Sequence, residues 1–530
     1  MARVSKELLD TAAPGAGECA KPNKEETSNR NPVSSENSPY TVFTLSDLRR
    51  LRIILGLGTI TSPLTATIYL PLLPLLRHQF SVSAQAINLT LTLYIIFQAI
   101  SPVIFGPFSD AYGRRPIYLL TLGLYVLGNI GLAANRDNYA VLLVLRAVQS
   151  LGASAAYAIS FGVVADVCEP NERGRMLGPV SMALNLGACV GPVIGGIVAY
   201  ANNNHTWVFW SLVIVGIVLF LGVGLLLPET AKRLVGNGGD PARFKWWQVS
   251  WVQLIRSHTM SKSSTTGMSS LYGSESVVRE PAHKVAIKNL LACFRMIFYP
   301  DSFLTLWMHG SFYTVDYSFV AALPDIFKDI YEYNEWQLGL AYLPRGVGII
   351  IGSYVTGKLM DRDYAKTLRE LGWTTDRVNP DELVNFPIEK ARARNTYLFL
   401  FVSTGTIVGY GWAVTQSAHP AVALVLQFIQ GFWGTYFYTT YSALMVDTYP
   451  QSPSTAAAAT SVTRCAMAAA GVAILQPLLD VAGRGWYFTA LGLWSGLFGI
   501  AAVALLRWKG SVWRSRRSRP TAEIQAARQG

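Results

Sequence analysis

Charged side chains inside long apolar segments are the residues of this sequence best placed to do chemistry. Arg146, Arg345 and Arg464 lie well inside such segments, and Asp316 is the one carboxylate at comparable depth. A charge within a bilayer is unfavourable unless it is paired or hydrated, so each of these residues is a functional candidate. Three deep cations against one anion leave an excess of positive charge, which water, helix ends or an anionic substrate would have to compensate. Arg345 and Asp316 could instead simply pair with each other.

Uncharged polar residues accompany these charges. His309 shares a segment with Asp316 and could titrate near neutral pH. A second segment, which begins near Gln427, is rich in tyrosine hydroxyls that suit an amphiphilic ligand. Packing between helices would use the same groups equally well. The predicted substrate and proton pathway comprises Arg146, Gln149, Asp316, Arg345, Gln427, Tyr441 and Arg464.

Signatures of other chemistries are missing from the sequence. The five cysteines are far apart, and we find no metal-ligand spacing, no phosphate-binding loop and no nucleophile elbow. We therefore expect neither an enzyme nor an ATP-driven pump. The expected protein needs no metal or other cofactor and takes its energy from an ion gradient.

Twelve apolar segments must position these residues. Hydrophobic residues make up 51% of the 530-residue chain and charged residues only 14%, against about 25% charged in soluble proteins. A helix needs about 20 mostly apolar residues to cross a bilayer. This requirement predicts an all-α membrane protein with twelve transmembrane helices in two six-helix bundles. The predicted spans are 52–76, 84–108, 116–134, 140–166, 175–200, 206–228, 301–324, 336–359, 396–414, 420–446, 454–479 and 486–506.

The net charge of +12 follows from this topology. If both termini are cytoplasmic, nearly all of the 44 Lys and Arg residues fall on the cytoplasmic side, as the positive-inside rule requires. A nucleic-acid partner is not needed. One sequon, which begins at Asn204, lies in a predicted outer loop and weakly suggests a glycoprotein.

The spans also divide the chain. We expect a disordered cytoplasmic N-tail over 1–50, a bundle over 51–228 and a second bundle over 299–507. A polar, basic cytoplasmic linker over 229–298 separates the bundles, and a basic cytoplasmic C-tail covers 508–530.

An internal repeat relates the two bundles. Gly106-x-x-x-Asp110 ends the second span, and Gly357-x-x-x-Asp361 ends the eighth. The distance from Arg146 to Asp166 in the fourth span equals that from Gln427 to Asp447 in the tenth. Parallel repeats of this kind are typical of transporters whose halves rock about a midplane site.

Three stretches carry a family resemblance. The loop 106–116, GPFSDAYGRRP, is similar to the signature of the major facilitator superfamily, and Leu227-Pro-Glu-Thr fits the same family. The fifth span resembles the antiporter motif of the fungal drug:proton antiporters with twelve spans. The segment 386–392, FPIEKAR, resembles the branch with quinidine-resistance transporters and citrate exporters. The antiporter motif residues are Gly187, Gly191, Pro192, Gly195 and Gly196.

The resemblance implies roles for these motifs. It assigns the charged loop to conformational gating, by Gly106, Asp110, Gly113, Arg114, Arg115, Gly357 and Asp361. The glycines of the fifth span would seal the protein against proton leak, although small residues at this spacing also serve ordinary helix packing.

The function implied is proton-coupled efflux by alternating access. The expected substrate is a small organic molecule, such as a secondary metabolite, a drug in multidrug resistance, or an organic acid. The antiporter would act as a monomer in the plasma membrane. A nutrient importer or uniporter of the same fold and a non-transporting membrane sensor are the alternatives.

Overall fold

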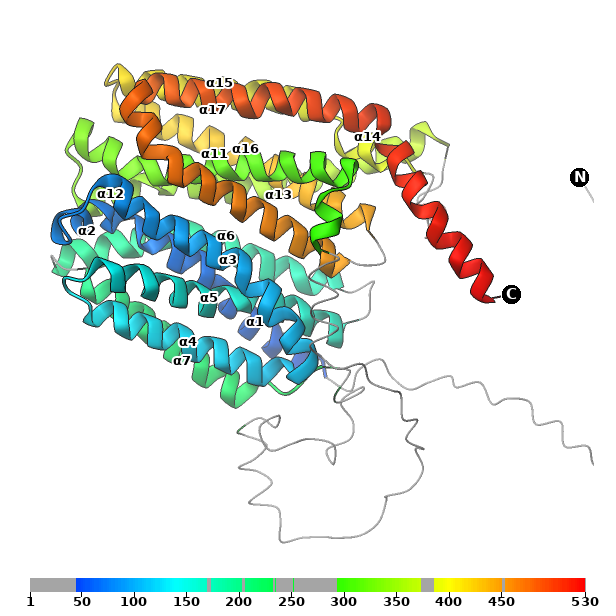
Figure 1. The fold of residues 1–530 in the computed structure, drawn as a ribbon, viewed down its shortest axis with the longest axis horizontal. Coiled ribbons are helices and arrows are strands. Elements are labelled where there is room, and N and C mark those ends of the chain that lie inside the picture. Colours follow the sequence, from blue (N-terminus) through cyan, green and yellow to red (C-terminus); the bar gives the residue numbers. More distant parts are fainter. Residues whose placement is uncertain are drawn as a thin grey trace, which may run out of the picture. The chain divides into compact units, whose positions relative to one another are not determined.

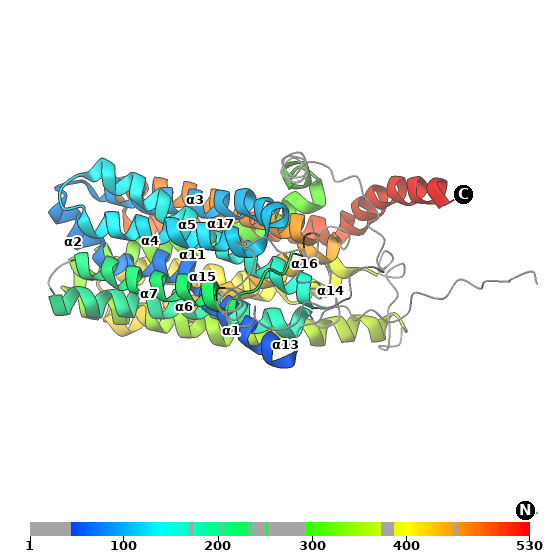
Figure 2. The same cartoon turned by 90° about the horizontal axis from the view of Figure 1, so that it is seen from below.

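A computed structural model describes residues 44–168, 173–202, 205–231, 234, 251, 293–372, 386–449 and 453–529. The predicted glycosylation residue Asn204, nearly all of the N-tail and most of the linker lie outside the described residues. Within them, the secondary structure is helical throughout. Figures 1 and 2 show the long helices of both halves running side by side.

The first half contains six long helices, one of them continued by two short ones. Figure 1 draws them in blue to green. Their bounds are α1 Leu45–Ile68, η1 Leu70–Leu72, α2 Leu73–Gln79, α3 Ala84–Tyr112, α4 Arg114–Ala134, α5 Tyr139–Val167, α6 Arg173–Asn202 and α7 Thr206–Leu226.

The second half repeats this plan in green to red. Its last element, α17, contains two predicted spans that join at Gly483, where the backbone leaves the helical conformation at φ 73°. The bounds are α11 Pro300–Tyr331, α12 Glu335–Ala341, α13 Leu343–Glu370, α14 Ile388–Arg392, α15 Thr396–Thr415, α16 Pro420–Thr448 and α17 Pro453–Gln529.

Two expected boundaries need correction. Helix α1 begins at Leu45, not after residue 50, because Thr44 and Asp47 form a reciprocal capping box at its start. At the other end, the segment 508–529 continues helix α17, where a separate tail was expected. Helices α1 and α17 therefore extend beyond the apolar residues from which the boundaries were predicted.

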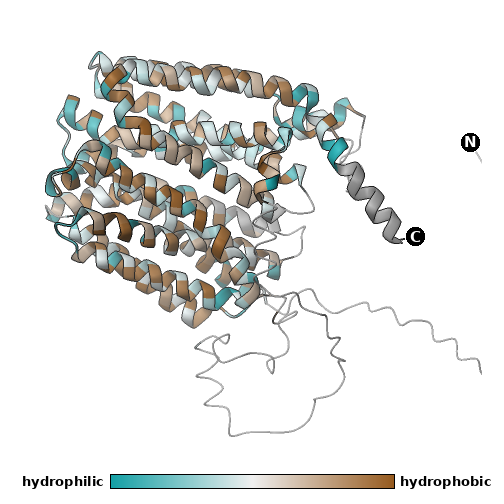
Figure 3. Ribbon diagram, viewed as in Figure 1, coloured by the Kyte–Doolittle hydropathy of each residue, from teal (hydrophilic) through white to brown (hydrophobic). Residues whose placement is uncertain are grey.

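The helices confirm an all-helical membrane protein. Among the described residues, nine helices are long and apolar enough to cross a membrane, and the last of these holds two predicted spans. Helices α11 and α16 are not among the nine. Both contribute residues to the cavity described below. Figure 3 shows hydrophilic residues gathered mainly at the helix ends.

The packing of the core differs between the two ends of the bundle. At the end that carries η1, α2 and α12, one apolar cluster joins both halves, for example Leu72 with Leu323 and Phe327. At the opposite end the clusters separate, with Val163 in a cluster of the first half and Phe437 in one of the second. The halves are therefore closed against each other at one end only.

Candidate substrate cavity

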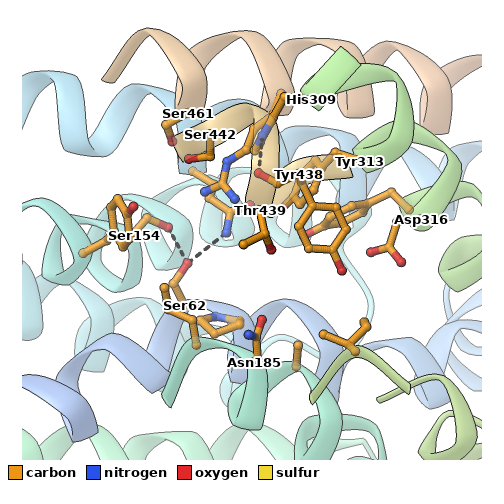
Figure 4. A pocket seen from close by; sticks show the side chains of 18 of the residues that line it. Ser62, Ser154, Asn185, His309, Tyr313, Asp316, Tyr438, Thr439, Ser442 and Ser461 are labelled. Atoms are coloured by element: carbon orange, nitrogen blue, oxygen red, sulfur yellow. Dashed lines mark hydrogen bonds between the residues drawn. The ribbon is translucent and has the colours of Figure 1, made fainter. Parts of the chain in front are cut away.

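A cavity of about 530 Å³ lies between the two halves. Its walls come from α1, α3, α5 and α6 on one side and from α11, α13, α16 and α17 on the other. Its position between the halves matches the site expected for a transporter built from two repeats. Figure 4 shows the labelled polar side chains of both halves facing the cavity.

The wall from the first half is polar but uncharged. Ser62 on α1 and Ser154 on α5 place their hydroxyl oxygens 2.9 Å apart. Gln98 on α3 donates through Nε2 to Ser62 Oγ at 3.0 Å. Asn185 on α6 donates to Ser353 Oγ at 3.2 Å and so links the two halves beside the cavity.

The wall from the second half carries the charges of the cavity. Arg345 Nε donates to Asp316 Oδ1 at 2.9 Å, and a second contact joins Nη2 to Oδ2. Asp447, near the end of α16, is paired with Arg392 at 3.0 Å. The alternative of mutual pairing thus holds for Arg345 and Asp316, although both still line the cavity.

Arg464 is the exception among these charges. Its guanidinium carbon lies 4.9 Å from the centre of the Tyr313 ring, and it forms no ion pair with any described residue. Nearby, His309 Nδ1 lies 2.9 Å from the carbonyl oxygen of Tyr438, while Nε2 has no partner in the described part of the chain. Since the other lining charges are paired, Arg464 gives the cavity an excess positive charge.

Arg146 and Gln149 do not line the cavity. Arg146 is fully buried, donates to Gln149 Oε1 at 2.6 Å and lies over the rings of Tyr69 and Tyr94 at 4.0 and 4.5 Å. Gln149 in turn donates to Asn129 Oδ1 at 2.6 Å. The charge of this arginine is therefore met by tyrosine rings and an amide within the first half.

Two residues of the second half that were predicted for the substrate pathway also pack between helices and do not line the cavity. Gln427 donates weakly to the Tyr410 hydroxyl at 3.5 Å, and the Tyr441 hydroxyl donates to Thr396 Oγ1 at 3.4 Å. Both side chains are buried away from the cavity. Sequence reasoning missed several lining residues, because single small polar residues in apolar helices give no signal of where they face. These residues are Ser62, Gln98, Ser154, Asn185, Thr439, Ser442 and Ser461.

The loop between α3 and α4 is held by a charge cluster. Arg114 donates through Nε to Asp166 Oδ2 at 2.9 Å and also pairs with Asp110. Glu229 accepts from the backbone N–H of Arg114 at 2.8 Å and so caps helix α4. Burial raises the pKa of Glu229 above its ordinary value, and the backbone N–H groups partly offset this rise. Gly113, at φ 112°, makes the tight turn that brings these groups together.

The second half reproduces part of this cluster. Asp447 occupies the position that the repeat predicts for it, because it pairs with Arg392 as Asp166 pairs with Arg114. Asp361 is exposed and makes no ion pair within the described residues, so the match to Asp110 does not extend to its contacts. Asp363 is buried instead and accepts from Asn395 at 2.6 Å.

The remaining residues of the predicted gating set are Arg115, Gly106 and Gly357. Arg115 donates to the carbonyl oxygen of Gly224 at 2.8 Å and is buried. A methyl group at Gly106 would meet only Ala158 at 3.7 Å, and one at Gly357 would meet nothing within 4 Å. Close approach therefore requires a glycine at neither position.

The glycines of α6 lie where helices approach most closely. Added methyl groups at Gly187, Gly191 and Gly195 would collide with α1, which packs along this face. Gly196 faces the other half, and a methyl group there would lie 2.6 Å from the carbonyl oxygen of Glu335 and 2.9 Å from Gly339 Cα. Pro192 lies inside α6. This arrangement is the close small-residue packing that the spacing predicts.

The end of α17 is tied into the second half by one buried and one partly buried arginine. Arg514 pairs with Glu389 of α14 at 3.2 Å and donates to the Phe386 carbonyl oxygen at 2.6 Å. Arg517 pairs with Asp301 of α11 at 2.6 Å. The FPIEKAR segment therefore anchors the last helix. Burial raises the pKa of Glu389, and the Arg514 guanidinium partly offsets this rise.

Replacing Arg514 by alanine is expected to destabilise the protein. The change leaves Glu389, only 4% exposed, without its guanidinium partner, and breaking a buried pair typically lowers the free energy of unfolding by about 3–5 kcal/mol. Thermal unfolding of the detergent-purified protein measures the loss. Arg516→Ala, at an exposed position of the same helix, is the matched control. Equal melting temperatures for both variants would contradict a stabilising role for the pair.

Comparisons with known proteins agree with this geometry. Residues 55–472 match the model of the Major Facilitator Superfamily. The MFS-type transporter tstD of Talaromyces stipitatus is 32% identical over 93% of this chain and 87% of its own length. Citrate exporter 1 of Aspergillus niger is 34% identical over 92% of this chain and 90% of its own.

Solved structures show the same fold. The human organic anion transporter MFSD10 superposes with a TM-score of 0.52 at 18% identity, covering 87% of this chain and 99% of that one. The xylose transporter XylE of E. coli, in a partially occluded inward-open conformation, gives 0.57 at 15% identity with the same coverage. The chain is thus a member of the major facilitator superfamily, a multi-pass membrane transporter and not an enzyme.

Proposed function

We propose that this transporter exports a small carboxylated organic molecule from the cell in exchange for protons. The observation that carries the proposal is Arg464, a cavity-lining cation without an ion-pair partner among the described residues. A positive charge in a low-dielectric cavity is unfavourable until an anion neutralises it. A carboxylate suits a guanidinium especially well, because two parallel hydrogen bonds form between their planar groups.

The size of the cavity and the relatives support a small metabolite. A volume of about 530 Å³ lies within the roughly 300–1,000 Å³ range of small-molecule sites. One relative at 34% identity is named a citrate exporter, and tstD is named an MFS-type transporter. A carboxylated metabolite is the substrate class that fits both the name of this relative and the positive charge of the cavity.

The open end of the bundle gives the cavity a route to one side of the membrane. The cavity lies between halves that pack together at the end carrying α2 and α12 and have separate cores at the end carrying α14. The charge distribution predicts cytoplasmic termini; with these termini and residence in the plasma membrane, which is part of the proposal, the open end faces inward. A cytoplasmic substrate would then enter this conformation and leave after the halves rock to the other side.

Proton exchange would involve the ion pair of Asp316 and Arg345. Protonation of Asp316 adds one positive charge to the cavity, while its carbonyl oxygen still accepts a hydrogen bond from Arg345. An empty, protonated carrier therefore returns inward with extra positive charge. The inside-negative membrane potential favours that step, at about 2.3 kcal/mol per charge and 100 mV.

Transport into inside-out vesicles tests the proposal. The probe is radiolabelled citrate, and the vesicle lumen corresponds to the cell exterior. Acidifying the lumen should accelerate uptake several-fold, and a protonophore should remove the acceleration. Citrate uptake that ignores the pH gradient would eliminate proton exchange. If the vesicles take up a neutral or cationic drug but none of the carboxylates tested, the proposal of an anionic substrate is excluded.

Replacing Asp316 by asparagine is expected to uncouple uptake from the pH gradient. Asparagine keeps an oxygen for Arg345 but cannot titrate, so acid in the lumen should no longer accelerate uptake. Exchange of unlabelled citrate inside for labelled citrate outside should continue, because it needs no net proton movement. Asp329→Asn, which alters an exposed pair with Arg484, is the control. Acceleration that survives in the Asp316 variant would place proton coupling elsewhere.

A further inference from the structure

The uncharged wall of the cavity contains an acceptor without a donor. Gln98 is 8% exposed and lines the cavity. Its Nε2 donates a hydrogen bond to Ser62 Oγ, but its Oε1 has no hydrogen-bond partner among the described residues. Ser62 is itself fixed by Ser154, and its carbonyl oxygen accepts from the Tyr94 hydroxyl at 2.9 Å. The amide of Gln98 is therefore held by its bond to Ser62, and its buried oxygen is left without a partner among the described residues.

This unpaired acceptor has a counterpart on the opposite wall, a donor without an ion-pair partner among the described residues. Arg464, from α17 of the second half, offers N–H groups with no carboxylate to receive them, whereas Gln98, from α3 of the first half, offers an oxygen with no donor. Buried polar groups are nearly always paired, so an unpaired group in a ligand cavity indicates what the ligand supplies. Here the ligand must supply an anionic acceptor to one wall and a hydrogen-bond donor to the other.

We infer that the transporter selects hydroxy acids, with a substrate carboxylate on Arg464 and a substrate hydroxyl donating to Gln98 Oε1. The inference rests on the proposed function and narrows its substrate class. A second carboxylate does not suit Gln98, because both partners would be acceptors and the described lining of the first half contains no cation. The terminal amide torsion is soft, so the amide can rotate; the rotation gives up the bond from Nε2 to Ser62 and turns Oε1 toward the hydroxyl.

A hydroxyl contact of this kind predicts discrimination against the analogue that lacks the hydroxyl. Such an analogue leaves the buried acceptor unpaired, and sites built to bind a substrate hydroxyl reject these analogues strongly. Two matched pairs isolate the effect. Citrate and tricarballylate share three carboxylates and differ by one hydroxyl, and malate and succinate differ in the same way.

The test measures uptake of the four acids into the inside-out vesicles. The wild-type protein should transport at least one hydroxy acid about tenfold or more faster than its partner. Gln98→Met, which keeps the volume but removes the acceptor, should lower uptake of the hydroxy acid to the level of its analogue and leave the analogue unchanged. A merely structural role would lower both acids of a pair together.

Two further variants complete the design. Thr67→Val is the matched control, since Thr67 also lines the cavity but its hydroxyl is already bonded to the Pro63 carbonyl oxygen at 2.7 Å. It should keep the wild-type ratio. If Gln98→Met fails to fold, Ser154→Ala loosens the support of Ser62 and should reduce the ratio partially.

The outcomes separate the inference from the proposed function. Equal wild-type uptake within both pairs, or a ratio that survives Gln98→Met, would overturn the hydroxyl contact while leaving carboxylate export intact. Uptake of a neutral or cationic drug, with uptake of none of the four acids, would overturn both.

Discussion

Transport of the carboxylated substrate is expected to be lost when Arg464 is replaced by glutamine. The substitution removes the cavity's unpaired cation and leaves a substrate carboxylate without a partner in a low-dielectric site. Loss of one member of a buried charged contact costs about 3 kcal/mol, which corresponds to roughly a hundredfold weaker binding. Citrate uptake into inside-out vesicles measures the effect, and the amount of protein in the membrane should stay normal.

Two companion variants sharpen the result. Arg464→Lys keeps the charge but not the planar fork, so it should retain part of the uptake. Arg484→Gln removes an arginine from an exposed pair with Asp329, outside the cavity, and should leave transport nearly unchanged. Wild-type uptake by Arg464→Gln would show that the positive charge of the cavity does not bind the substrate.

Replacing Gly339 by leucine is expected to hold the two halves apart at their closed end. Any Cβ atom at Gly339 would lie 2.8 Å from the Pro192 carbonyl oxygen and 3.1 Å from Gly196 Cα. These are backbone atoms on the other half, so no side chain can rotate away to make room. The carrier should therefore favour the conformation opposite to the one described here, and transport should fall at least tenfold.

Labelling of Ser442→Cys in the cavity measures this shift. A membrane-impermeant maleimide should react more slowly from the side of the termini in the Gly339→Leu background, and faster from the other side. Labelling of the chain without the introduced cysteine gives the background from the native thiols, of which the four in the described part of the chain are buried. Gly405→Leu is the matched control, because a Cβ atom at Gly405 would meet nothing within 4 Å. Unchanged accessibility in the Gly339 variant would mean that this contact does not govern closure.

Much of the architecture could be read from the sequence. The apolar segments predicted the helices because the length needed to cross a bilayer leaves few alternatives. Charge near the segment ends and the glycine spacing in α6 were equally informative, because they reflect local rules that hold along one helix. Arg464, Arg345 and Asp316 were identified in the same way, since an ionised group within an apolar span requires an exceptional environment.

The direction in which each polar side chain faces was decided by the tertiary structure alone. Arg146 and Arg464 have similar sequence surroundings, yet Arg146 is enclosed by tyrosine rings of its own half and Arg464 lines the cavity. Gln98 and Gln427 differ in the same sense, because one lines the cavity and the other is buried in helix packing. A helical period fixes which residues share a face, but the neighbouring helices determine whether that face meets protein, lipid or the cavity, and this depends on contacts between residues far apart in the chain.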